Sequence, residues 1–157
     1  MSRDDFPSRT GHAGPMLPLP GAQMEGHWEF DYAVIPHAGD WRTASREARA
    51  FTASLRAVEA DAHAGVLPAC GSIVDVTPPE FEISAIKRSE DGCGMLVRGW
   101  NTTERPLRVH IRPGKKFARA ERVNLAEERL RSLRPGRNGE VTLTAKPLEI
   151  VTVLFKG

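Results

Sequence analysis

Apolar and polar positions alternate with a period of two through most of the chain after residue 70. Leu107, Val109 and Ile111 alternate with polar neighbours, and similar runs occupy residues 73–76, 81–85, 95–100, 117–125, 127–133, 141–145 and 150–155. This period places successive side chains on opposite faces of a β-strand. Turn-forming dipeptides such as Asp91-Gly92 and Asn138-Gly139 separate the runs. The pattern predicts an all-β fold, an antiparallel immunoglobulin-like β-sandwich over residues 70–157.

The same period appears earlier, between Gly26 and Pro36. Trp28, Phe30 and Tyr32 fall on alternate positions with Glu29 and Asp31 between them. This segment predicts one further strand, which Pro36 ends because proline lacks a backbone donor. Since an open apolar strand invites association, we expect it to fold back on the sandwich or to pair across a homodimer.

Between residues 40 and 55 the apolar positions recur at steps of three and four, which predicts a short helix capped by Asp40. Its apolar face consists of Trp41, Ala44, Ala48, Phe51 and Leu55. Arginines lie toward the other side, at positions 42, 46 and 49. We interpret these arginines as the solvent-exposed face of the helix. The alternative is that they bind an anionic ligand.

Composition limits the class of protein. Residues 1–24 are rich in Pro, Gly, Ser and charge, which predicts an extended or disordered arm. The net charge of +2 gives little reason to expect a nucleic-acid partner. No apolar run approaches the roughly 20 residues that span a membrane, and no secretion signal is visible. We therefore expect a cytoplasmic protein without a membrane partner.

Candidate chemistry is sparse. A zinc site needs three or four converging ligands, and nothing in the pattern brings together the histidines and aspartates at positions 27, 31, 37, 40, 63 and 110. Cys70 and Cys93 predict buried small side chains or one adventitious bond. Glycoside hydrolysis needs two carboxylates at a set separation, and each acidic residue is explained as a turn or strand position, so no catalytic and no metal-binding residue is assigned.

Aromatic side chains offer another interpretation. Trp28, Trp41 and Trp100 could stack on a sugar, although the positions of two of them favour core packing. With His27 and His37 they form the candidate set for a carbohydrate contact or an interface.

A series of short segments resembles the C-terminal β-sandwich region of family 38 glycoside hydrolases, the α-mannosidases, in collinear order over residues 20–157. The segments are Pro20–Gln23, Gly26-His27, Pro36-His37 with Gly39-Asp40, Leu67-Pro68, Ser72–Val76, Ile83–Lys87, Glu90–Gly92 with Gly94, Leu96–Asn101, Val123–Leu125 with Glu127-Glu128, and Pro147–Thr152. The resemblance implies that residues 25–69 correspond to the end of the family's large middle sandwich, and residues 70–157 to its closing sandwich.

The resemblance also implies what this chain does not supply. In that family the zinc, the nucleophile and the acid/base carboxylate belong to a preceding catalytic domain, which nothing here matches, so no cofactor is expected in this chain. The implied role is a non-catalytic β-domain that braces a catalytic α-mannosidase domain and lines the sugar cleft. Two alternatives stay open: an autonomous module that binds a mannose-containing carbohydrate or another subunit, and an enzyme in its own right.

Overall fold

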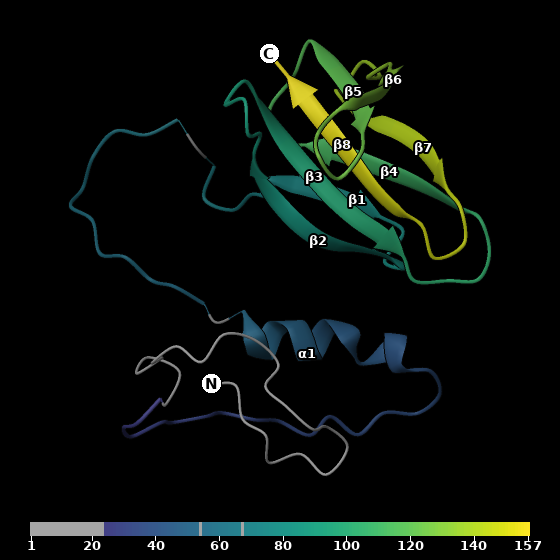
Figure 1. Ribbon diagram of the computed structural model, residues 1–157. Helices are drawn as coiled ribbons and strands as arrows, with labels where there is room; N and C mark the ends of the chain where they lie inside the picture. Colours follow the sequence, from purple (N-terminus) through teal and green to yellow (C-terminus); the bar gives the residue numbers. More distant parts are fainter. Residues whose placement is uncertain (1–23, 54, 67) are drawn as a thin grey trace, which may run out of the picture. The chain divides into compact units, whose positions relative to one another are not determined.

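The computed structural model describes residues 24–53, 55–66 and 68–157 (Figure 1). The predicted arm of residues 1–24 lies outside these residues, apart from Met24. The chain divides into two compact units, residues 1–36 and 37–157. The helix expected between residues 40 and 55 therefore belongs to the same unit as the strands.

The second unit begins with helical turns and continues with strands. Its elements are the 3-10 helix η2 (Trp41–Thr43), the helix α1 (Ser45–Thr52) and the strands β1 (Val74–Thr77), β2 (Phe81–Arg88), β3 (Gly94–Asn101), β4 (Leu107–Pro113), β5 (Arg119–Val123), β6 (Arg129–Leu133), β7 (Val141–Ala145) and β8 (Ile150–Lys156). The strands follow the runs of alternating residues in the sequence closely.

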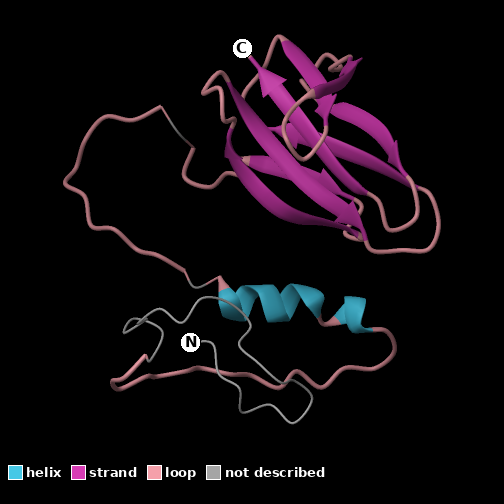
Figure 2. Ribbon diagram, viewed as in Figure 1, coloured by secondary structure: helices cyan, strands magenta, loops and turns pink. Residues whose placement is uncertain are grey.

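The strands form two antiparallel sheets that face each other (Figure 2). One sheet has the order β1-β4-β7 and the other the order β2-β3-β8-β5-β6. Every pairing is antiparallel. This arrangement confirms the predicted antiparallel β-sandwich.

The core lies between the two sheets. Val97, Val153 and Phe155 of the larger sheet are fully buried and belong to one cluster with Val109 and Ile111 of the smaller sheet. Their neighbours in sequence point outward, as the period of two requires. Because these apolar side chains leave water together, they supply the main stabilising free energy of the fold.

A smaller apolar cluster lies on the outer face of the five-stranded sheet, where Leu96, Val123 and Leu154 are buried. The turn between β5 and β6 contacts the same sheet, where Arg98 of β3 donates to the carbonyl oxygen of Leu125 at 3.2 Å. Glu127 in this turn lies 2.8 Å from the ammonium of Lys87 and accepts a hydrogen bond of 2.8 Å from the backbone N–H of residue 90. The turn is thereby tied across the sheet to β2.

The strand expected between residues 26 and 36 does not form. These residues are extended but have no strand pairing among the described residues. Trp28 is 54% exposed and Tyr32 is 88% exposed. The predicted strand with one buried face is therefore wrong, because alternation alone does not supply a partner for the N–H and C=O groups of a strand.

Two smaller expectations are also wrong. Cys70 and Cys93 are exposed thiols without a disulfide, rather than buried side chains or a disulfide pair. Both lie in irregular segments, where no sheet face covers them. Leu55 and Phe51, assigned to an apolar helix face, are exposed as well.

No helix in the described part of the chain is long and apolar enough to cross a membrane.

Candidate functional site

The segment from Asp40 to Thr52 is held against the outer face of the larger sheet by polar contacts. Asp40 is the N-cap of η2, as predicted, and accepts a hydrogen bond of 2.9 Å from the backbone N–H of Arg42. The eight residues of α1 contain no buried side chain. A helix this short is marginal in isolation, so its contacts with the sheet decide whether it persists.

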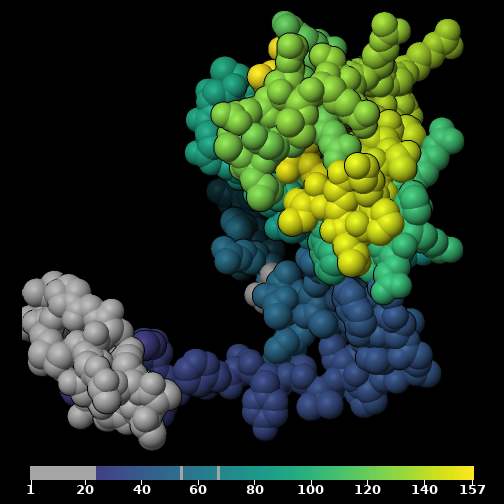
Figure 3. All heavy atoms as spheres, turned by 45° about the vertical axis from the view of Figure 1, so that its right-hand side comes forward, coloured from purple at the N-terminus to yellow at the C-terminus, as the bar shows by residue number. Residues whose placement is uncertain are grey.

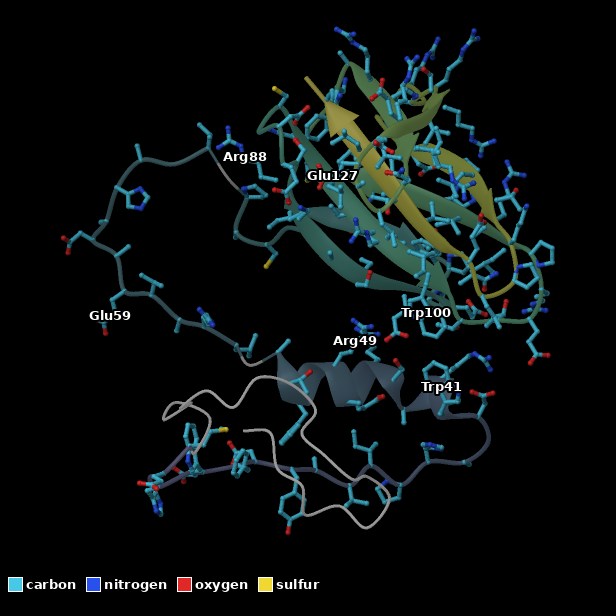
Figure 4. The ribbon with its side chains drawn as sticks, viewed as in Figure 1. Trp41, Arg49, Glu59, Arg88, Trp100 and Glu127 are labelled. Carbon is cyan, nitrogen blue, oxygen red and sulfur yellow. The ribbon has the colours of Figure 1, made fainter. Side chains whose placement is uncertain are left out.

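Two tryptophans meet at this surface (Figure 4). The rings of Trp41 in η2 and Trp100 in β3 are nearly parallel, with centroids 6.3 Å apart and planes inclined by 13°. The guanidinium of Arg42 lies 5.3 Å from the centre of the Trp41 ring, within cation–π range. Trp41 is 46% exposed. The core interpretation of the tryptophans is therefore wrong: the stack lies on the outside of the sandwich.

The arginines of this segment divide into two kinds. Arg42 donates through Nε to the carbonyl oxygen of Thr102 at 2.8 Å, with a second bond from Nη2. Arg49 pairs with the carboxylate of Glu82 and donates to the carbonyl oxygen of residue 83 at 2.7 Å (Figure 4). Only Arg46 matches the solvated face that we expected, since it is exposed and has no ion pair with a described residue.

A pocket of about 750 Å³ opens beside Trp41. Its lining combines one aromatic ring with charged groups and a hydroxyl: Asp40, Trp41, Arg42, Glu80, Thr103, Glu104 and Arg105. A second pocket of about 230 Å³ shares Trp41, Arg42 and Glu80 with it. An aromatic platform ringed by donors and acceptors is suited to a small polar ligand with an apolar face.

Asn101 shapes the loop that supplies three of the pocket residues. Its side chain is fully buried, and its amide nitrogen donates to the carbonyl oxygens of Arg105 at 2.7 Å and Lys146 at 2.9 Å. Its amide oxygen accepts from the backbone N–H and the hydroxyl of Thr103 at 2.9 and 2.7 Å. A buried amide with four such bonds fixes the loop. The tripeptide Asn101-Thr102-Thr103 predicts only a turn at this position.

The predicted site residues separate into three groups. Trp41 and Trp100 come together, although Trp100 does not line the pocket. His37 is exposed and does not line it either. His27 and Trp28 belong to the first unit and are exposed there. The pocket residues at 80 and 103–105 were missed, because a polar run between two strands reads only as a loop.

Four carboxyl groups have a pKa that is lowered by neighbouring groups of the sandwich. Hydrogen bonds lower the pKa of Asp75 through Arg112, of Asp91 through Ser89 and of Glu127 through Lys87. Partial burial raises the pKa of Glu149, but the Lys146 amide and the Arg122 guanidinium outweigh it, so that pKa is also lowered.

A glycosidase general acid needs the opposite, a raised pKa. Every carboxyl whose pKa departs clearly from its ordinary value, among residues 24–53, 55–66 and 68–157, is shifted downward. The same residues contain no group of three or more His, Cys, Asp or Glu side chains that could hold a metal ion.

Comparison with known proteins places this geometry in a family context. Residues 80–153 match the model of the glycosyl hydrolases family 38 C-terminal beta sandwich domain. A relative from Halalkalibacterium halodurans, named "Putative mannosylglycerate hydrolase", is 26% identical over 143 residues. The match covers 90% of this chain and 16% of the relative, so the chain spans about a sixth of that protein's length. No solved structure matches the chain.

Proposed function

Residues 80–153 form a C-terminal β-sandwich of the glycoside hydrolase family 38 type, and from this premise we propose that the chain is a non-catalytic β-domain of an α-mannosidase-like hydrolase. In this role it braces a catalytic region and contributes a wall to the sugar cleft. The zinc and the reacting carboxylates are then supplied by that catalytic region, and the substrate carries mannose.

The state of the carboxylates is the observation that carries this proposal. Glu82, Glu127 and Glu149 are each engaged by a cation of the sandwich itself, through Arg49, Lys87 and Arg122. A carboxylate held in this way stabilises the fold and is poorly suited to delivering a proton to a glycosidic oxygen. These three carboxylates stabilise the sandwich itself, which supports a non-catalytic domain.

A chimera tests the bracing role. The segment of the Halalkalibacterium relative that matches this chain is replaced by the chain itself, and a second variant has the segment deleted. We expect the chimera to keep the hydrolytic rate of the relative within about tenfold and to keep its thermal midpoint nearly unchanged. The deletion is expected to lose the activity and to lower the thermal midpoint. A chimera as inactive as the deletion, although expressed and folded, would contradict the proposal.

A second function, an autonomous carbohydrate-binding module, is favoured by the pocket beside Trp41. Sugar rings stack on exposed aromatic faces while charged side chains bind their hydroxyls. Titration of the isolated chain with mannose oligosaccharides measures this directly. Saturable binding that Trp41→Ala abolishes and Trp28→Ala leaves unchanged would support the module. Absence of binding would leave the bracing role as the only proposal.

A further inference from the structure

The strand β6 is an open and strongly cationic edge of the larger sheet. It pairs with β5 on one side and ends the strand order, so its other side has no partner among the described residues. Residues 129–137 include four arginines and no acidic residue, at positions 129, 131, 134 and 137, and all four are exposed. Long side chains from this yellow-green part of the chain project from the surface in Figure 3.

The arginines of this edge are largely free to meet an external partner. Arg129 lies 3.8 Å from Glu121, a long contact in an exposed place. Arg131, Arg134 and Arg137 have no ion pair with another described residue. Leu130, in the same strand, is 60% exposed. An edge with this charge repels another copy of itself and attracts an acidic strand.

The other three strand edges are less suited to an acidic partner. Arg49 already occupies part of the β2 edge by bonding to Glu82 and to the carbonyl oxygen of residue 83. The edge strand β1 carries Asp75, and β7 carries no charged residue. β2 also carries Lys87 and Arg88, but Lys87 is already paired with Glu90 and Glu127. Among the described strands, β6 therefore has the edge with the most unpaired positive charge.

The segment of residues 24–36 has the complementary character. It has no strand pairing with another described residue, and it contains Glu25, Glu29 and Asp31 but no lysine or arginine. Its aromatic side chains are exposed, with Phe30 at 79%. Nine residues lie between Gly26 and Pro36, more than the five residues of β6.

We propose that residues 27–35 of one copy of this chain add as a strand to the free edge of β6 in a second copy. The backbone groups of the added strand complete the hydrogen bonds that the edge leaves open. Glu29 and Asp31 then lie within reach of Arg129 and Arg131. Two such pairings, one in each direction, close a two-fold dimer in which the β6 edge of each copy is covered.

Chain reach does not exclude pairing within one molecule. A strand added outside β6 lies four strand positions beyond β3, a lateral distance of about 19 Å, and the chain between Ile35 and Trp41 extends about 21 Å at most. The two-chain experiment below therefore includes pairing within one molecule as the outcome that overturns the proposal.

Charge reversal in two separate chains tests the pairing. One variant carries Glu29→Arg and Asp31→Arg, and the other carries Arg129→Glu and Arg131→Glu. Each alone brings like charges together and is expected to sediment as a monomer, while the wild-type chain sediments as a dimer. Mixed in equal amounts, the two variants present opposite charges at both pairings and are expected to form a heterodimer of twice the monomer mass.

The matched control is Arg105→Glu with Arg108→Glu, which makes the same charge change at exposed arginines far from β6 in sequence and should stay dimeric. Circular dichroism of each variant checks that the sandwich is folded. A wild-type chain that remains monomeric at about 100 μM, or a mixture that gains no mass, would overturn the proposal. A wild-type monomer whose residues 27–35 are nevertheless protected from hydrogen exchange would show pairing within one molecule instead.

Discussion

Removal of the two arginine anchors, Arg42→Ala with Arg49→Ala, is expected to release residues 41–52 from the sheet without unfolding the sandwich. Arg42 makes two hydrogen bonds to the Thr102 carbonyl oxygen, and Arg49 bonds Glu82 and a backbone carbonyl. The segment buries little apolar surface, since Ala44 is its only buried residue. Its attachment therefore depends mainly on polar contacts.

The magnitude follows from these contacts. Hydrogen bonds from a charged donor contribute about 1.5–3 kcal/mol, and a half-exposed ion pair such as Arg49 with Glu82 adds only about 0.2–1 kcal/mol. With the two Arg42 bonds to one carbonyl oxygen counted once and the exposed Arg49 contacts counted as the ion pair alone, the sum is about 2–4 kcal/mol. This corresponds to a roughly 30- to 1000-fold rise in the population of the released state. We expect a population rise near the lower end of this range, about 30-fold. The reason is that water replaces Arg42 as the hydrogen-bond donor to the Thr102 carbonyl oxygen after release.

Native-state hydrogen exchange measures this population directly. The amides of Ala48 and Ala53, which bond within the helix, should exchange at least about 30-fold faster in the double variant. The amides of β3 and β8 should not change. Arg46→Ala is the matched control, since it removes an arginine of the same helix without a sheet contact. Equal exchange in the double variant and this control, or faster exchange throughout the sandwich, would refute the reasoning.

Three further changes probe the sandwich itself. Phe155→Ala opens a cavity in the core and should lower the free energy of unfolding by about 3–5 kcal/mol in urea titrations; a loss below about 1 kcal/mol would place Phe155 outside the core. Gly99→Ala puts a methyl group 2.7 Å from the Glu82 carbonyl oxygen, so the thermal midpoint should fall, and an unchanged midpoint would show that β2 can move away. Glu127 has its pKa lowered by Lys87, so its stabilisation is full above the unfolded pKa and disappears as the pH falls through the folded pKa. Glu127→Gln should therefore reduce the loss of stability between pH 6 and pH 3, and an unaltered pH dependence would contradict the ion pair.

Much of the sandwich was predictable from sequence because its turns are encoded locally. Gly92 and Gly139 both adopt positive φ, at 71° and 80°, where the dipeptides Asp91-Gly92 and Asn138-Gly139 predicted turns. The alternation of Leu107, Val109 and Ile111 then fixed which face of β4 enters the core. These signals lie within a few residues of the structure that they determine.

The features that sequence reasoning missed depend on distant partners. Trp28, Phe30 and Tyr32 alternate as in a strand, yet a strand forms only where another edge is available. The helical period predicts a solvent-exposed face for Arg42 and Arg49, because a period within one segment carries no information about distant residues. In the fold, Arg42 meets the carbonyl oxygen of Thr102 and Arg49 meets Glu82. The pocket was missed for the same reason, since η2 and the loop after β3 meet only in the folded chain.

The hydrolysis of a nitrophenyl α-mannoside and of mannosylglycerate by the purified chain, with and without added zinc, tests the central claim most directly. The chain is proposed to brace a catalytic region rather than to cleave the bond itself. The account predicts no turnover above the rate in buffer under either condition. Turnover that co-purifies with the chain and depends on one of its own carboxylates would contradict it.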